Sequence, residues 1–143
     1  MISIDRISDS TKDKVCSFLK SVPSIEMVDS AILDNAVIVL EEEKVVGCIS
    51  FEVFGNKGLI RYFVFKKILD NKTLENLVNE LEKKALELMI NTLVCIAEND
   101  QIEELFNGLG FSDIDTNMIF FNEEDIKNTN FKKSIFLKKV LNY

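Results

Sequence analysis

Few side chains in this sequence could carry out acid–base chemistry. The chain has no histidine, which excludes a histidine base and a zinc site built from cysteine and histidine. The carboxylate of Glu52 could accept a proton, and the hydroxyl of Tyr62 could donate one. Arg61 would favour an anionic ligand, and alternation along a strand places Arg61 and Tyr62 on opposite sides. The alternative for each of the three is an ordinary surface or packing role.

The three cysteines do not suggest a reactive site. Cys16, Cys48 and Cys95 are far apart and lie among apolar residues. No two of them have the spacing of metal ligands, so we expect no metal. We expect these thiols to be buried and reduced, which favours a location in the cytoplasm. A packing role for them is favoured over a role as catalytic nucleophile.

The charge balance limits the partners. The chain has 17 basic and 24 acidic side chains and a net charge of −7. Such a domain is repelled by phosphate backbones, so we expect no nucleic-acid partner. Segment Met1–Lys20 lacks the pattern of a signal peptide, and no apolar stretch is long enough to span a membrane. Four lysines near the C-terminus could protect a strand edge or form an anion or partner site; they are Lys132, Lys133, Lys138 and Lys139.

The elements that must position these side chains follow from the apolar pattern. Alternating or continuous apolar runs predict strands, and apolar residues at helical spacing predict helices. The predicted strands are Ile2–Ile7, Ala36–Leu40, Val45–Phe54, Leu59–Phe65, Thr92–Ala97, Asp113–Phe121 and Ser134–Leu141. The predicted helices include Asp9–Lys20 and Ser24–Leu33. A long helix should be capped by Asp70 or Asn71, and its apolar stripe should extend to Leu88 and Met89. The last helix should be Asp100–Leu109, with Gly110 as its C-cap.

The order of these elements predicts the fold class. Short turns, among them "GNKG" at Gly55–Gly58, predict that three consecutive strands form an antiparallel meander. The strand that follows the long helix should be parallel and central. We therefore expect one domain, residues 1–143, of the α/β (α+β) class. Its sheet should be mixed but mostly antiparallel, with about six to seven strands and helices on both faces.

The turn between the fourth strand and the long helix, in "VFKKILDNKTLENLV", contains no glycine. Strand-to-helix turns that hold phosphate usually need glycine, because the backbone must approach the ligand closely. Lys66, Lys67 and Lys72 could still supply charge to a phosphate at the helix N-terminus. The alternative is a plain connection whose Asp70 carboxylate would compete with any anion.

Several stretches together resemble the GNAT family of N-acetyltransferases across essentially the whole chain. In "AENDQIEELFNGLGF", Asn99, Leu105, Gly110 and Phe111 match the family's pattern of a strand end, an Asn, and a helix followed by Gly-Phe. In "NLVNELEKKALELMI", the apolar spacing of Leu77, Val78, Leu81 and Ala85 matches the family's long helix. Gly47 fits a glycine that is common in the second hairpin of the family.

The resemblance implies transfer of an acetyl group from acetyl-CoA, or binding of CoA, with an amine of a small molecule or a peptide as the acceptor. It also implies that the fourth strand and the crossover strand splay apart around the pantetheine arm. The implied catalytic residues are Glu52 and Tyr62, with Glu26 in the loop on the acceptor side. The implied cofactor-binding residues are Phe63, Val64, Phe65, Leu69, Asn71, Lys72, Thr73, Leu74, Asn99 and Phe106. A homodimer through the final strands is possible.

Four positions depart from the family pattern. Leu69 stands where the diphosphate loop has Arg or Gln, and Lys72 and Leu74 stand at its two glycine positions. Phe106 stands where the family usually has Tyr, so this ring lacks the hydroxyl that often protonates the leaving thiolate.

The departures leave more than one function open. The first is a divergent acyl-CoA-dependent N-acyltransferase. The second is a binding or regulatory module that has lost CoA chemistry, with Leu69, Leu74 or Phe106 filling the cleft. A weaker third hypothesis is an anion-binding protein that uses Lys66, Lys72 and Arg61.

Overall fold

The computed structural model describes residues 2–23, 25, 27–97, 100–113, 120–121, 124–125 and 135–141. The predictions made on Glu26, Asn99, Lys132 and Lys133 lie outside these residues. The chain divides into two compact units. The first is Met1–Glu52 with Ile60–Lys84, and the second is Val53–Leu59 with Ala85–Tyr143.

The main sheet contains seven strands among the described residues, in the order β1-β2-β3-β4-β5-β9-β6. β4 pairs with β5 in parallel, whereas the pairs β1–β2, β2–β3, β5–β9 and β6–β9 are antiparallel. The expected mixed, mostly antiparallel sheet is therefore confirmed. The strands are β1 (Ile2–Arg6), β2 (Val37–Glu41), β3 (Lys44–Phe54), β4 (Lys57–Phe65), β5 (Thr92–Ala97), β6 (Ser112–Asp113) and β9 (Ile135–Val140).

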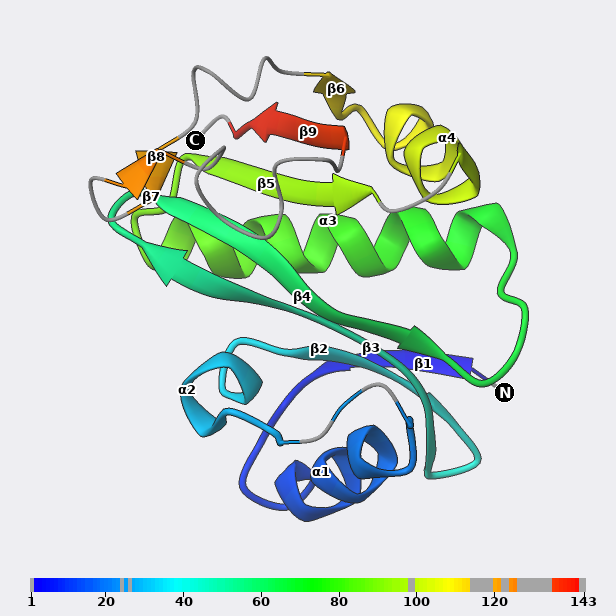
Figure 1. Cartoon of the computed structure of the whole chain (residues 1–143). Helices are drawn as coiled ribbons and strands as arrows, with labels where there is room; N and C mark the ends of the chain where they lie inside the picture. Colours follow the sequence, from blue (N-terminus) through cyan, green and yellow to red (C-terminus); the bar gives the residue numbers. More distant parts are fainter. Residues whose placement is uncertain are drawn as a thin grey trace. The chain divides into compact units, whose positions relative to one another are not determined.

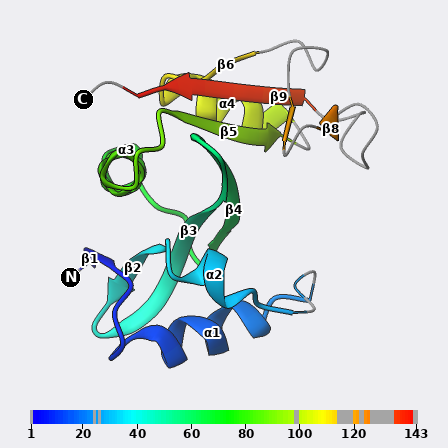
Figure 2. The same cartoon turned by 90° about the vertical axis from the view of Figure 1, so that its left-hand side faces the viewer.

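In the first unit, helices lie on both faces of the strands. Helix α1 (Lys12–Lys20) and helix α3 (Asn71–Glu87) lie on opposite sides of β1–β3 (Figures 1 and 2). The short helix α2 (Ser30–Leu33) lies on the α1 face. The core of that face consists of Val15, Phe18, Leu19, Leu33, Ala36, Ile38 and Cys48. Apolar residues at helical spacing thus meet every second residue of the strands, as the two periodicities require.

Two helices of the first unit are shorter than predicted. Helix α1 begins at Lys12 instead of Asp9, because Ser8–Thr11 forms a hydrogen-bonded turn. Helix α2 covers only Ser30–Leu33 of the predicted Ser24–Leu33. Asp29 explains this start, since its extended backbone and its Oδ1, which accepts the N–H of Ala31 at 2.9 Å, make it an N-cap.

In the second unit, β5 is flanked by β4 and β9. Lys57–Leu59 of β4 pair with Thr92–Val94, and β9 pairs with the whole of β5. The predicted parallel and central position of this strand is confirmed. Helix α4 (Asp100–Gly108) packs against β5 and β9.

The apolar stripe of α3 ends earlier than predicted. The helix stops at Glu87, and Leu88 and Met89 are 49% and 71% exposed instead of inward-facing. The reason is the backbone of Met89, whose φ of 66° is left-handed and turns the chain. The N–H of Ile90 then donates to the carbonyl of Ala85 at 2.9 Å, which closes the helix end.

Of the four C-terminal lysines, the two described ones, Lys138 and Lys139, do not lie on a free strand edge. Strand β9 lies between β5 and β6 and pairs with β6 at Lys138. Lys139 donates from its Nζ to the carbonyl of Leu109 at 3.1 Å, just after α4. Gly110 has a φ of 96°, which confirms its predicted place at the end of the helix.

The predicted strand Asp113–Phe121 contains parts of two different sheets. Its first residue belongs to β6 in the main sheet. Its last two residues form β7 (Phe120–Phe121), which pairs with β8 (Glu124–Asp125) in a separate two-stranded sheet.

Candidate functional site

Strand β4 has an irregular backbone at Tyr62. The φ of this residue is 54°, in the left-handed region that non-glycine residues rarely adopt. Such a residue inside a strand costs about 1–3 kcal/mol, and strained positions of this kind cluster at functional sites. The left-handed φ interrupts the extended backbone of the strand at this residue. The guanidinium of Arg61 lies over the Tyr62 ring, 5.7 Å from its centroid, so the predicted placement of these residues on opposite sides is wrong.

The Tyr62 side chain joins β4 to the segment before α2. Its ring packs against the core cluster beneath α1, and its hydroxyl oxygen accepts the backbone N–H of Asp29 at 2.8 Å. A phenol that accepts one hydrogen bond still has its own proton to donate. The same residue thus carries the strained backbone and holds the loop that leads into α2.

Glu52 and Arg61 form an ion pair next to this position. Arg61 Nη1 lies 2.7 Å from Glu52 Oε1, and the two side chains are 40% and 32% exposed. Glu52 alternates with Cys48, which belongs to the α1 core, and with Ser50, whose hydroxyl donates to the carbonyl of Ile32 in α2. The face of β3 that carries Glu52 is therefore the face covered by α1 and α2.

Four residues thus make up what we call the β4 polar cluster: Asp29, Glu52, Arg61 and Tyr62. Both predicted catalytic residues, Glu52 and Tyr62, belong to it. The sequence did not indicate that Asp29 would join them, because that contact depends on the short length of α2. The cluster offers a carboxylate, a guanidinium and a phenol within one unit of the chain.

The turn between β4 and α3 is capped by its own carboxylate. Asp70 Oδ1 accepts the N–H of Thr73 at 2.8 Å, and the Asp70 carbonyl accepts the N–H of Leu74 at 3.1 Å. The hydrogen bonds from Thr73 lower the pKa of the Asp70 carboxyl, so it is ionised at neutral pH. Of the two predicted caps, Asp70 is the one used, and Asn71 is the exposed first residue of the helix.

Two of the three lysines of this turn, Lys66 and Lys67, have partners within the first unit. Lys67 Nζ pairs with Glu41, and this pairing lowers the pKa of the Glu41 carboxyl. Lys66 Nζ lies over the ring of Phe18, 5.1 Å from its centroid. Lys72 is exposed, whereas Leu69 is buried and Leu74 is half-buried. We refer to residues 66–74, with these contacts, as the β4–α3 turn.

The last residues of β4 pack closely on β3. A Cβ at Gly47 would lie only 2.4 Å from Cδ1 of Phe65, so only glycine leaves room for this ring. The Phe63 and Phe65 rings meet edge to face with centroids 4.8 Å apart. Val64 packs against the core beneath α1. These three predicted cofactor contacts therefore also have packing roles.

Phe106 belongs to the core of the second unit. It is fully buried, and its ring meets that of Phe111 edge to face with centroids 5.2 Å apart. Burial also raises the pKa of the Cys48 and Cys95 thiols to about 12, which suits packing residues and disfavours a cysteine nucleophile. Among the described residues, no cluster of acidic residues and cysteines could hold a metal ion.

Comparison with known proteins gives a fold. No protein-family model and no curated protein matches the sequence. Solved structures match over the whole chain. N-acetylglutamate synthase from Neisseria gonorrhoeae, complexed with coenzyme A and N-acetyl-glutamate, has a TM-score of 0.77 and 16% identity. This chain is covered completely but spans only 36% of the synthase.

Smaller proteins match over their full length. A GNAT-family acetyltransferase from Staphylococcus aureus has a TM-score of 0.68 at 15% identity, covering 99% of this chain and 100% of its own. Rv2747 from Mycobacterium tuberculosis, in complex with CoA and NLQ, has a TM-score of 0.70 at 15% identity, covering 98% and 99%. The chain has the GNAT fold. The fold that the sequence resemblance implied is thereby confirmed.

In a GNAT fold, the β4–α3 turn is where the resemblance places the diphosphate of CoA. The residues present fit that group poorly. The Asp70 carboxylate already accepts the N–H of Thr73 at the start of α3, and side chains stand at Lys72 and Leu74 where the family pattern has glycine. A second anion at this helix end would meet the negative charge of Asp70 and an N–H of Thr73 that already has an acceptor.

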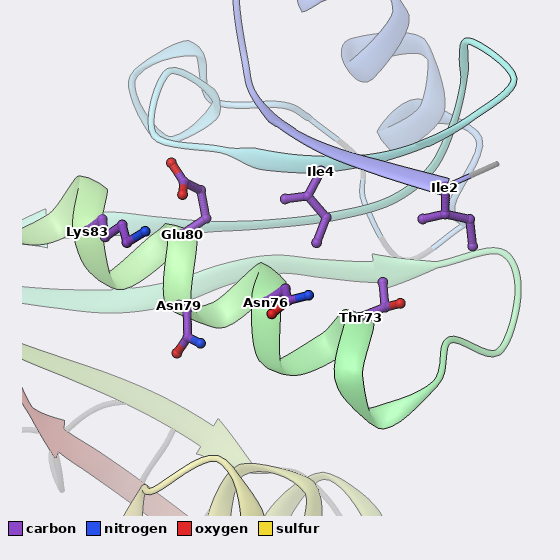
Figure 3. A pocket seen from close by; sticks show the side chains of 7 residues that line it. All are labelled: Ile2, Ile4, Thr73, Asn76, Asn79, Glu80 and Lys83. Atoms are coloured by element: carbon purple, nitrogen blue, oxygen red, sulfur yellow. The ribbon is translucent and has the colours of Figure 1, made fainter.

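A shallow depression on the α3 face of the GNAT fold was not indicated by the sequence. It lies between β1 and α3 (Figure 3). Its acidic group, Glu80, pairs with Arg6 at 2.7 Å. Of the predicted site residues, Thr73 lines it. Its lining is Ile2, Ile4, Thr73, Asn76, Asn79, Glu80 and Lys83.

No helix among the described residues is long and apolar enough to cross a membrane.

Proposed function

We propose that the chain is a divergent acyl-CoA-dependent N-acyltransferase, which moves an acetyl group from acetyl-CoA to an amine on a small molecule or a peptide. In a reaction of this class, the amine nitrogen bonds to the acyl carbon, the carbon–sulfur bond breaks, and the amine's proton is passed on to the thiol. The acceptor side needs a base for that proton and groups that orient the amine.

The observation that carries the proposal is the β4 polar cluster. Its Tyr62 has a left-handed backbone, a strained conformation of the kind that clusters at functional sites, and it lies next to Arg61, the partner of Glu52. Glu52 is the base in this proposal, and Tyr62 is the proton donor that Phe106 cannot be. The likeness to structures solved with coenzyme A, and to a structure described as a GNAT-family acetyltransferase, supports the reaction class. We place the protein in the cytoplasm, where its buried thiols stay reduced.

A specific observation favours a second candidate. The capped helix end at Asp70 supports a binding or regulatory module that has lost CoA chemistry. In that case the GNAT fold would serve as a scaffold, and the cluster on β4 would bind a ligand without reacting with it.

Thermal unfolding with acetyl-CoA tests the proposal. A ligand that binds only the folded chain raises the Tm in proportion to its occupancy. We expect acetyl-CoA at millimolar concentration to raise the Tm, and thiol release to follow when amines are added. If acetyl-CoA does not shift the Tm and no amine leads to thiol release, the acyltransferase proposal is rejected. The binding or regulatory module then remains as the candidate function.

A further inference from the structure

The Glu52–Arg61 pair differs in its setting from other ion pairs of the first unit. Arg6–Glu80 joins β1 to α3, and Lys12 joins α1 to Asp34 next to α2. Each of those pairs connects two parts of the chain that are not neighbouring strands of the sheet. Glu52 and Arg61 lie on β3 and β4, which backbone hydrogen bonds already join in the sheet. A half-exposed ion pair contributes only about 0–1 kcal/mol to the free energy of unfolding, so the Glu52–Arg61 pair stabilises the fold little.

The pair keeps most of its hydrogen-bonding capacity. The contact uses Nη1 of Arg61 and Oε1 of Glu52. A guanidinium has five N–H donors and a carboxylate has two oxygen acceptors, so each group can bind a further partner. The guanidinium is also held in place by the Tyr62 ring beneath it.

The charges of the pair select a particular kind of ligand. A simple anion would be attracted by Arg61 and repelled by Glu52, and a simple cation would meet the reverse. A zwitterion, which carries an ammonium and a carboxylate on neighbouring atoms, meets an opposite charge at both ends. Its carboxylate can accept from the guanidinium while its ammonium donates to Glu52, and charge-assisted bonds of this type are the strong ones.

Tyr62 and Asp29 frame this position. The Tyr62 hydroxyl accepts the N–H of Asp29, so its proton can still be donated to a ligand carboxylate. One oxygen of the Asp29 carboxylate, Oδ1, accepts the N–H of Ala31 in α2. The segment before α2 is therefore fixed on β4 at the cluster, as an acceptor pocket requires.

We infer that the β4 polar cluster binds a free α-amino acid, with its carboxylate on Arg61 and its amino group on Glu52. The inference rests on the proposed function for its role as the acceptor site, but the binding itself does not need a donor. The ligand's ammonium is placed on the same carboxylate that is proposed to take its proton.

Ligand-observed NMR on the full chain, without any donor, tests the binding. The probes are the twenty standard amino acids, followed by the N-acetylated and the decarboxylated form of each one that binds. We expect at least one amino acid to bind and both of its analogues to bind about tenfold more weakly or worse, since each lacks one charged contact.

Variants assign the binding to the cluster. E52Q and R61Q should each weaken amino-acid binding about tenfold, because each removes one charged partner. The matched control is E80Q, which breaks an ion pair of the same 2.7 Å length and similar exposure on another part of the unit and should bind like the wild type. The swap E52R/R61E keeps an ion pair in place and thus controls for folding, but it reverses the polarity of the site and should also weaken binding.

The outcomes separate this inference from the proposed function. Unchanged binding in E52Q and R61Q, or no binding by any amino acid, overturns the amino-acid site. If thiol is nevertheless released from acetyl-CoA with simple amines, the proposed acyltransferase function is retained and only the amino-acid site is rejected. Amino-acid binding that is lost in E52Q and R61Q, together with no transfer from any donor, supports the site and rejects the acyltransferase.

Discussion

Two stretches that follow one another along the chain, the β4 polar cluster and the β4–α3 turn, treat their charged groups differently. In the cluster, Glu52 and Arg61 are paired but partly exposed, beside a strained backbone at Tyr62. In the turn, Lys67 is paired, Lys66 lies over an aromatic ring and Asp70 caps its own helix. Apart from the exposed Lys72, the charged groups of the turn therefore have partners in the chain, whereas the Glu52–Arg61 pair keeps donors and acceptors for a ligand.

We propose from this difference that the acceptor side and the donor side of the candidate site are built independently of one another. The absence of glycine at Lys72 and Leu74 bears on the binding of a diphosphate, but Glu52 and Tyr62 are still present in the same unit. We therefore expect a protein whose acceptor side is specific and whose donor side is weak. The predictions that follow challenge each side in turn.

The largest effect is expected from E52Q. Removal of the proposed base should lower kcat by about 100-fold, within the usual range for general bases, while the Tm changes little because the ion pair is half-exposed. Thiol release and thermal unfolding measure the two quantities. If E80Q, which breaks the Arg6–Glu80 pair, lowers kcat equally, the cluster is no more than a surface ion pair and the comparison fails.

A smaller loss is expected from Y62F. The ring and its packing remain, but the N–H of Asp29 loses its acceptor and the cluster loses a donor. A single hydrogen bond of this kind corresponds to about a tenfold change in kcat/KM. A pH–rate profile gives a second readout, since only a proton-transfer role changes its basic limb. A Y62F variant with wild-type kinetics would assign Tyr62 to packing alone.

The donor side should respond in the opposite direction to D70N. Asparagine caps a helix as well as aspartate does, but it removes the negative charge next to the helix end. Acetyl-CoA should then bind about two- to fivefold more tightly, as expected for one charge at a helix terminus. Calorimetric titration measures the affinity, and D34N serves as a control at a distant carboxylate. Equal affinities for wild type and D70N would show that no anion approaches this turn.

The smallest effect is a pH dependence of stability. The folded-state pKa of Asp70 is lowered, so its stabilising contribution is complete above its unfolded pKa and is lost as the pH falls through the folded value. The difference in Tm between wild type and D70N should therefore be constant above about pH 5 and change only below about pH 4. A difference that varies instead around neutral pH would contradict the capping role.

The sequence predicted what depends on local pattern. The strand at Thr92–Ala97, the hairpin at Gly55–Gly58 and the cap at Asp70 all follow from neighbours in the chain. The left-handed backbones of Tyr62 and Met89 could not be predicted, because neither is the glycine that normally marks such a turn.

The partners of the candidate site residues were also beyond the sequence. The Glu52–Arg61 pair depends on the register between β3 and β4, and the Asp29–Tyr62 contact spans 33 positions. The sequence left open whether Lys66 and Lys67 supply charge to a phosphate or stand in solvent, and only the tertiary structure showed that Phe18 and Glu41 lie within their reach.

The close contact between Gly47 and Phe65 has an evolutionary consequence. Any side chain at position 47 collides with the ring, and overpacking of this kind typically costs about 1–3 kcal/mol. The two positions should therefore covary among relatives of this chain. An alanine at 47 should be found only where position 65 has already lost its ring, so the order of the two substitutions in a lineage is fixed by sterics.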